Sequence, residues 1–184
     1  MAKKKPMLFI DWKPITETDH IPPFGDEFAA HINSYKGKVR QASCSAWNLL
    51  YQMLIRMNIP PCHVAFSETG KPYFADADLC FSILKGTSKD VCVAAVADRQ
   101  IGVDVEVIKD DYRPHLIDRT PTEREKEEFD GDFTRVWCRK EDLVKMSGEG
   151  IKSYPFNIDT TEKAFREKRI AYNGARYWIV SILE

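Results

Sequence analysis

The stretch IGVDVEVIKD, from Ile101 to Asp110, predicts a buried strand that carries two acidic side chains on one face. Strand side chains alternate, so the valines point to one face while Asp104 and Glu106 point to the other. Two neighbouring carboxylates repel each other, and their burial costs free energy unless a positive charge lies between them. Two interpretations are open: this face meets water, or it forms part of a site for a cation.

The composition is typical of a soluble globular protein. Of the 184 residues, 43% are apolar and 30% are charged, which is enough for one domain or two small lobes. The net charge of −1 provides no overall basic field, so we expect no nucleic-acid partner.

Scattered cysteines without a CxxC pair predict reduced thiols and no zinc site. The apolar run near the N-terminus ends at Asp11, too early for a secretory signal, and no later run can span a bilayer. We therefore expect a cytoplasmic protein without a membrane partner.

The hydrophobic pattern divides the chain into two halves with a related order of elements. In the first half it predicts a strand at Met7–Trp12, a helix at Lys38–Met57, and strands at His63–Phe66, Cys80–Leu84 and Val91–Ala97. The pair Asp98-Arg99 then predicts a tight hairpin into the strand that begins at Ile101.

The second half again combines helices with antiparallel strands. A polar helix is expected at Thr120–Phe129 and a second helix at Phe133–Ser147. Two strands, Arg166–Tyr172 and Ala175–Leu183, are joined by Asn173-Gly174, a strong hairpin signal. The second helix carries Glu141 and Lys145 one turn apart, and by itself this predicts only an exposed ion pair.

Three motifs, taken in order, resemble the signature of the 4'-phosphopantetheinyl transferases. They are the turn GKP at Gly70-Lys71-Pro72, the strand IGVDVE, and the helix WCRKEDLVK with the glycine-rich GEGI after it. The residues that match in type and order are Gly102, Asp104, Glu106, Trp137, Lys140, Glu141 and Lys145. The resemblance covers roughly Arg40 to Ile151 and is to the larger, two-lobed class of the family, the surfactin-synthetase-activating class.

The resemblance implies an α+β fold of two similar lobes related by a pseudo-twofold. Each lobe is expected to pack a helix on a small antiparallel sheet, with residues 1–99 in the N-terminal lobe and 100–184 in the C-terminal lobe. Coenzyme A is expected in the cleft between the lobes. Because both lobes lie on one chain, we expect a monomer.

The implied activity is that of a holo-[acyl-carrier-protein] synthase. Such a 4'-phosphopantetheinyl transferase moves the 4'-phosphopantetheine arm of coenzyme A onto a serine of an apo acyl or peptidyl carrier protein. It releases adenosine 3',5'-bisphosphate and serves fatty-acid or secondary-metabolite biosynthesis. The serine attacks a pyrophosphate, and Mg²⁺ suits this chemistry because it prefers carboxylate and phosphate oxygens. The implied Mg²⁺ ligands are Asp104, Glu106 and Glu141.

The resemblance also implies roles for charged residues around the metal. Glu141 is the expected general base and acts on the serine directly or through a water. Lys145 is the second catalytic residue, because its ammonium would stabilise charge on the pyrophosphate. Lys140 is expected either to contact the pyrophosphate or to support the fold. The residues expected to bind coenzyme A are Arg40, Lys71, Lys85 and Lys145.

One segment departs from the pattern of the family. In CFSILKGTS, Leu84 falls where relatives carry a serine and Lys85 falls where they carry a histidine, and both of those residues normally hold phosphates. Lys85 can replace the histidine as a point charge, whereas Leu84 donates no hydrogen bond. Two interpretations follow: a working transferase that uses Lys85, or a non-catalytic relative that binds a nucleotide, coenzyme A or a carrier protein. A metal-dependent phosphohydrolase has no motif of its own in this chain.

Overall fold

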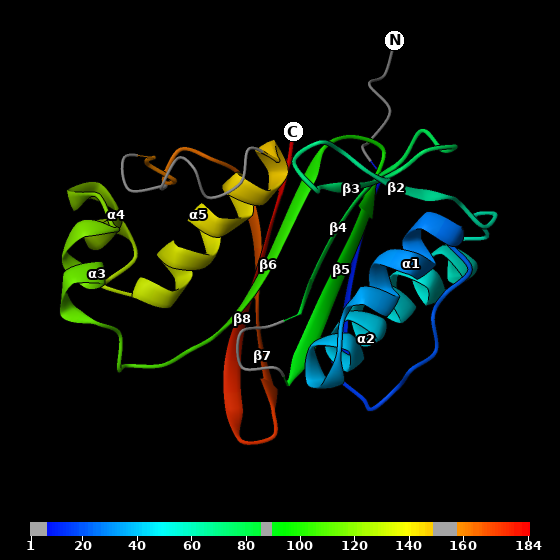
Figure 1. Ribbon diagram of the computed structural model, residues 1–184. Coiled ribbons are helices and arrows are strands. Elements are labelled where there is room, and N and C mark those ends of the chain that lie inside the picture. Colours follow the sequence, from blue (N-terminus) through cyan, green and yellow to red (C-terminus); the bar gives the residue numbers. More distant parts are fainter. Residues whose placement is uncertain (1–6, 86–89, 149–157) are drawn as a thin grey trace, which may run out of the picture.

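The computed structural model describes residues 7–85, 90–148 and 158–184, except for the side chain of Lys85. Runs of strands and runs of helices follow one another in a mixed α+β arrangement (Figure 1). In chain order they are β1 (Leu8–Pro14), α1 (Asp26–Ser34), α2 (Gly37–Arg56), β2 (Val64–Phe66), β3 (Pro72–Phe74), β4 (Cys80–Lys85), β5 (Val91–Ala97), β6 (Ile101–Val107), α3 (Pro114–Arg119), α4 (Glu123–Glu128), α5 (Phe133–Ser147), β7 (Phe165–Tyr172) and β8 (Ala175–Leu183).

Small antiparallel sheets lie at the centre of the molecule. One has the strand order β1-β5-β4, a second has the order β6-β8-β7, and β2 pairs with β3 in a two-stranded sheet. Figure 1 shows α1 and α2 on one side of the central strands and α3, α4 and α5 on the other. The chain therefore forms layers in the order helices, sheet, sheet, helices.

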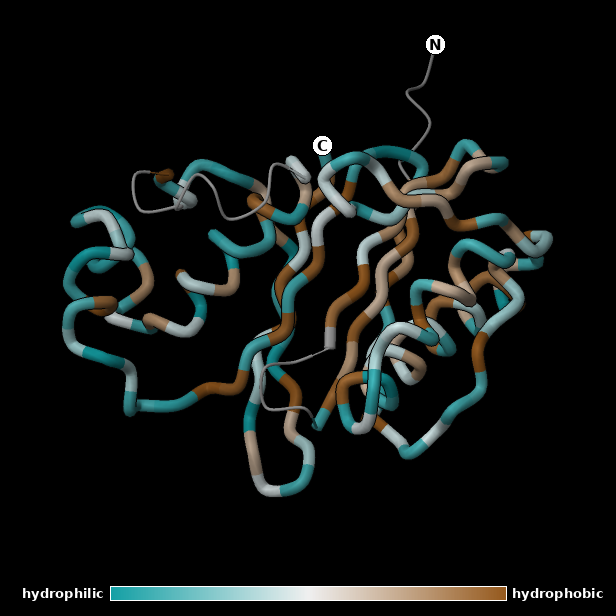
Figure 2. Tube along the Cα trace, viewed as in Figure 1, coloured by the Kyte–Doolittle hydropathy of each residue, from teal (hydrophilic) through white to brown (hydrophobic). Residues whose placement is uncertain are grey.

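The two three-stranded sheets are joined by an apolar core. Alternate residues of β5 and β6 point into it, and the hydrophobic residues concentrate along these central strands (Figure 2). The buried side chains of this core are Val91, Val93, Ala95, Ala97, Ile101, Val103, Val105, Ile170, Tyr177 and Ile179. The valines of the IGVDVE strand thus face the first sheet, so its acidic residues face the opposite layer, where α5 lies.

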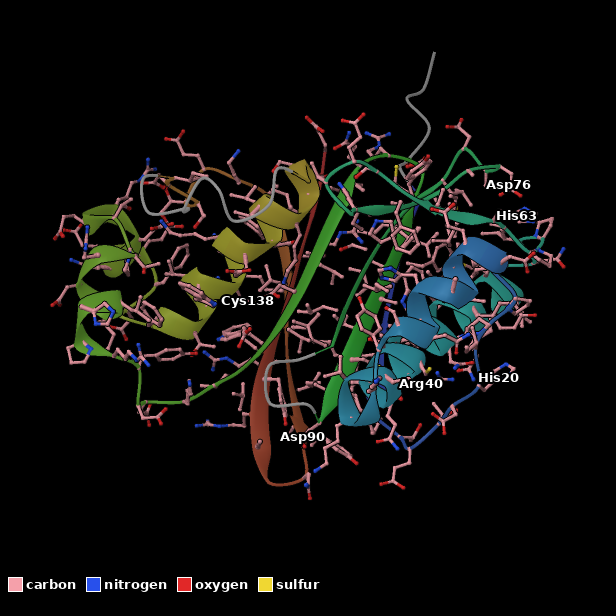
Figure 3. All side chains as sticks on the ribbon, viewed as in Figure 1. His20, Arg40, His63, Asp76, Asp90 and Cys138 are labelled. Carbon is pink, nitrogen blue, oxygen red and sulfur yellow. The ribbon has the colours of Figure 1, made fainter. Side chains whose placement is uncertain are left out.

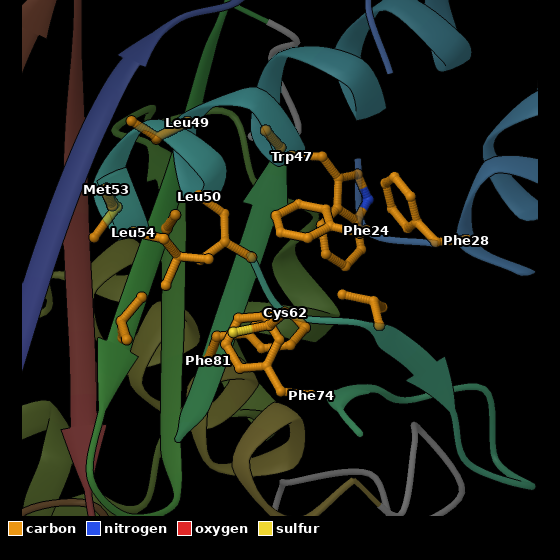
Figure 4. Close-up of a cluster of buried hydrophobic side chains, with 14 of the residues drawn as sticks. Phe24, Phe28, Trp47, Leu49, Leu50, Met53, Leu54, Cys62, Phe74 and Phe81 are labelled. Carbon is orange, nitrogen blue, oxygen red and sulfur yellow. The ribbon is translucent and has the colours of Figure 1, made fainter. Parts of the chain in front are cut away.

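A second core lies between the first sheet and helices α1 and α2. Aromatic rings dominate it, and Phe24 contacts Phe28, Trp47 and Phe74 (Figure 4). The ring of Phe81, on β4, packs on Phe74 with centroids 4.4 Å apart. Together the two cores bury β5 on both faces, which explains its continuous run of small apolar residues.

The predicted hairpin at Asp98-Arg99 is wrong. Strands β5 and β6 belong to different sheets, and the short connection between them carries the chain from one sheet to the next. The physical reason is that β5 is the central strand of its sheet, so both of its edges are already paired, with β1 and with β4. The hairpin at Asn173-Gly174 is confirmed, and both residues adopt the positive φ that a tight turn between β7 and β8 requires.

The helices differ from the expected ones mainly at their ends and in number. Helix α4 begins later than predicted because the Thr122 side chain caps it and Glu125 completes a capping box. Helix α5 has the predicted bounds, with Asp132 as its N-cap and Gly148 in the left-handed conformation at its end. Helices α1 and α3 were not predicted. In the described part of the chain, no helix combines the length and the apolar character needed to cross a membrane.

Candidate active site

Helix α5 lies against the acidic face of β6 at very short range. A Cβ atom added to Gly102 would lie 2.1 Å from Oδ1 and 2.5 Å from the backbone oxygen of Asp142, so only glycine allows this approach. Asp142 is fully buried, and its carboxyl oxygens have no hydrogen-bond partner among the described residues. Burial, reinforced by the charge of Asp104, raises the pKa of Asp142 to about 9, so Asp142 is neutral at pH 7.

Replacement of Gly102 by alanine tests this packing. We expect Gly102→Ala to lower the free energy of unfolding by about 1–3 kcal/mol, because the new methyl group pushes α5 away from β6. Urea denaturation measures the change. In the double variant with Asp142→Ala only part of the loss should return, since the backbone oxygen of residue 142 remains. An unchanged stability for Gly102→Ala would contradict the close approach.

Asp104 is fully buried beneath α5, so the interpretation in which its face meets water is wrong. Its Oδ1 forms an ion pair with the ammonium of Lys145, while its Oδ2 has no hydrogen-bond partner among the described residues. The same ammonium lies 4.0 Å from Oε2 of Glu141. One positive charge therefore stands between two carboxylates that come from β6 and from α5.

The pKa values in this cluster follow from burial and from the three charges. Burial raises the pKa of Glu141; the Lys145 ammonium acts in the opposite direction and the charge of Asp104 adds to the rise. For Lys145, burial acts to lower the pKa, but the charge and hydrogen bond of Asp104 together with the charge of Glu141 act against it, and the net pKa is raised. Lys145 is therefore firmly protonated, and Glu141 is a better proton acceptor than an exposed glutamate.

The third expected metal ligand lies farther along the strand. Glu106 is half-buried, and its charge contributes to the raised pKa values of Tyr112 and Cys138. Within the described ranges, no group of three or more His, Cys, Asp or Glu side chains is arranged as a metal site. The structure thus brings Asp104, Glu141 and Lys145 together, and the charge between the carboxylates is the ammonium of Lys145.

A pocket of about 330 Å³ opens beside this cluster. Its walls come from both halves of the chain: Lys71 in the GKP turn, Phe81 and Ser82 on β4, and Glu141 and Lys145 on α5. Its lining combines the apolar side chains of Pro72, Phe81, Ile83 and Val144 with the charged side chains of Lys71, Glu141 and Lys145. Such a pocket suits a ligand that combines an anionic group with an apolar part.

The GKP turn is fastened to the C-terminal end of α5. The ammonium of Lys71 donates to the backbone oxygen of Met146 at 2.7 Å, and the hydroxyl of Thr69 donates to that of Gly148 at 3.2 Å. Burial lowers the pKa of Lys71. A lysine at this place satisfies a free helix carbonyl and presents positive charge at the pocket.

Lys140 supports the fold and does not line the pocket. It is fully buried, pairs with the equally buried Glu125 at 2.9 Å, and donates to the backbone oxygen of Ile158 at 2.7 Å. Glu125 in turn accepts hydrogen bonds from the backbone N–H of Thr122 and from both the backbone N–H and the hydroxyl of Thr160. This network joins α4, α5 and the segment that leads to β7.

The remaining expected coenzyme A residues lie outside the pocket or outside the described side chains. Arg40 is on α2, across the central strands from Cys138 on α5 (Figure 3), where it pairs with Asp19 at 3.3 Å. The side chain of Lys85 and the glycine-rich segment after Gly148 are outside the described residues. Leu84 packs into the core between the sheets. The roles of Arg40 and Lys85 stay predictions.

Sequence reasoning gave no role to Ser82. Its hydroxyl oxygen accepts a hydrogen bond from the backbone N–H of Val103 at 3.1 Å, and this contact joins β4 to the strand that carries Asp104. Ser82 also lines the pocket. The sequence carried a signal for this contact. Ser82 lies two residues before Leu84 and so shares its face of the strand, and a polar side chain on an otherwise apolar face needs a hydrogen-bond partner.

This arrangement defines a class of site: a pocket with lysines and a glutamate in its lining, beside a buried aspartate on a strand of an antiparallel sheet that packs directly against a helix. Comparison with known proteins identifies a family for this chain. Residues 100–179 match the 4'-phosphopantetheinyl transferase superfamily. The chain is also 33% identical, over 134 residues that make up 67% of each chain, to the 4'-phosphopantetheinyl transferase AcpT of Salmonella typhimurium. The chain belongs to the 4'-phosphopantetheinyl transferase superfamily.

Proposed function

We propose that this protein transfers the 4'-phosphopantetheine arm of coenzyme A to a serine of an acyl or peptidyl carrier protein. The observation that carries the proposal is the pocket in which Lys71, Glu141 and Lys145 meet, with Asp104 paired to Lys145 behind them. The two lysines suit a diphosphate, and the apolar lining at Phe81 suits an uncharged arm. Membership of the superfamily supports the same reaction.

In the proposed reaction, the serine oxygen of the carrier forms a bond to the β-phosphorus of coenzyme A. The bond from that phosphorus to the bridging oxygen breaks, and adenosine 3',5'-bisphosphate leaves with the electron pair. Glu141 accepts the proton of the serine hydroxyl, directly or through a water, and its burial favours this role because it raises the pKa. Lys145 and Lys71 stabilise the negative charge of the diphosphate and of the leaving phosphate.

The residues present fit a divalent cation in charge and in donor chemistry. The donors are carboxylate oxygens, which Mg²⁺ prefers, and the buried Oδ2 of Asp104 has no other partner among the described residues. We propose Asp104 and Glu141 as the ligands, with Glu106 as a third. A bound Mg²⁺ would neutralise charge on the diphosphate.

The wider architecture of the proposal follows the larger, two-lobed class of the family. We propose that residues 1–99 and 100–184 form two lobes related by a pseudo-twofold, because the chain changes sheet between β5 and β6. The pocket has walls from both sides of this boundary, which supports a complete site within one chain and hence a monomer. We place the protein in the cytoplasm, where carrier proteins are modified.

A transfer assay tests the function. The protein is incubated with coenzyme A, Mg²⁺ and a panel of apo carrier proteins, and intact mass is measured. We expect one 4'-phosphopantetheine arm on at least one carrier, and no addition when the acceptor serine of that carrier is replaced by alanine. Bound coenzyme A without transfer to any carrier would contradict the proposal and favour a non-catalytic binding protein. Release of phosphate without a carrier would indicate a hydrolase.

A further inference from the structure

The ammonium of Lys145 lies between Asp104 and Glu141, the two residues proposed as ligands of a divalent cation. It forms an ion pair with Oδ1 of Asp104 and lies 4.0 Å from Oε2 of Glu141. Asp104 is fully buried, whereas 26% of the Lys145 side chain is exposed at the pocket. The side chain of Lys145 can therefore move toward the pocket, whereas the carboxylate of Asp104 stays buried.

Among the described residues, Lys145 is the cation that forms an ion pair with Asp104. Two positive charges close to one buried carboxylate repel each other, so a second cation would bind Asp104 less tightly while Lys145 stays in place.

We propose that Lys145 and a divalent cation compete for Asp104, so that the cation binds tightly only after Lys145 has moved to another anion. The diphosphate of coenzyme A is that anion, a step that rests on the proposed function. Lys145 can reach it because its ammonium already lies at the wall of the pocket. Coenzyme A should therefore strengthen metal binding, and metal should strengthen coenzyme A binding by the same factor.

The first consequence is visible without coenzyme A and without a carrier. Lys145→Met removes the competing charge, and the unbranched side chain keeps a similar volume. We expect this variant to bind Mn²⁺ at least about tenfold more tightly than the unmodified protein, as measured by electron paramagnetic resonance of the free ion. Lys126→Met is the matched control, because Lys126 also pairs with a glutamate but lies on α4, away from the pocket.

Two further variants locate the effect and guard against loss of the fold. Lys145→Gln leaves a neutral donor for the buried carboxylate and should also bind Mn²⁺ more tightly than the unmodified protein. Adding Asp104→Asn to Lys145→Met should cancel the gain in Mn²⁺ affinity, because the carboxylate for which Lys145 and the metal compete has been removed. Circular dichroism confirms that each variant is folded. Equal Mn²⁺ affinity in the unmodified protein and in both lysine variants, or a gain that survives Asp104→Asn, would overturn the proposal.

The second consequence uses coenzyme A as the probe. Saturating coenzyme A should tighten Mn²⁺ binding to the unmodified protein at least about tenfold more than to Lys145→Met, since only the former has a competitor to release. Chelation of Mn²⁺ by coenzyme A in solution is the same in both titrations. Equal tightening would refute the exchange of Lys145 between the two anions. These readouts are independent of transfer, so a protein that passes them and modifies no carrier would refute the proposed function alone.

Discussion

Glu141→Gln is expected to lower the rate of arm transfer by about 10²–10⁴-fold, because the variant loses the proposed proton acceptor. The fold should survive. Glutamine has nearly the same shape, and burial already disfavours the charged form of Glu141, so the loss of charge costs little stability. The measurement is the initial rate of carrier modification by intact mass, with thermal unfolding as the check on the fold.

The matched control is Glu127→Gln, the same replacement at an exposed position of α4. Its rate should equal that of the unmodified protein. If Glu141→Gln kept full activity, Glu141 would be neither the base nor a needed ligand, and the catalytic assignment would be wrong. A loss of activity together with a loss of structure would instead make Glu141 a residue of the fold.

Lys140→Met is expected to lower the free energy of unfolding by about 3–5 kcal/mol, because it leaves the buried carboxylate of Glu125 without its cation. Lys140 and Glu125 are both fully buried, and the ammonium also satisfies the backbone oxygen of Ile158. Urea denaturation measures the loss. For a domain of ordinary stability this is a large fraction of the total.

A double variant separates the buried charge from the packing. Adding Glu125→Gln should restore at least half of the loss, because the charge disappears while the amide oxygen still accepts a hydrogen bond from Thr122 or Thr160. The control is Lys126→Met, which breaks an exposed pair and should change stability by less than about 1 kcal/mol. If Lys140→Met were as mild as the control, Lys140 would not be the internal support that the structure indicates.

Most of the strands and α5 could be predicted because their signals are local, whereas the short strand β3 lies in the segment with the GKP turn and was not predicted. Alternation placed the valines of β6 on one face and Asp104 on the other, and the structure has this arrangement. Periodicity and the stop signal at Gly148 also gave α5 its correct bounds. The order of strands in the sheets could not be predicted, because it depends on which edges of β5 are already occupied by β1 and β4.

The ion-pair partners of the charged residues could not be predicted from the sequence. Lys140 and Lys145 lie five positions apart on one helix, and the sequence does not say that one pairs with Glu125 and the other with Asp104. Those partners come from α4 and β6, so only the packing of three elements decides them. The bond from Val103 to Ser82 is hidden for the same reason, because it joins two sheets.

The most direct test of the account is the position of the metal with coenzyme A bound. Crystals of the protein with coenzyme A and Mn²⁺ would reveal that position by the anomalous scattering of Mn²⁺. We predict a peak that contacts carboxylate oxygens of Asp104 and Glu141, with the ammonium of Lys145 on the diphosphate. A diphosphate in the pocket with Lys145 still on Asp104 and Mn²⁺ bound elsewhere would contradict the account.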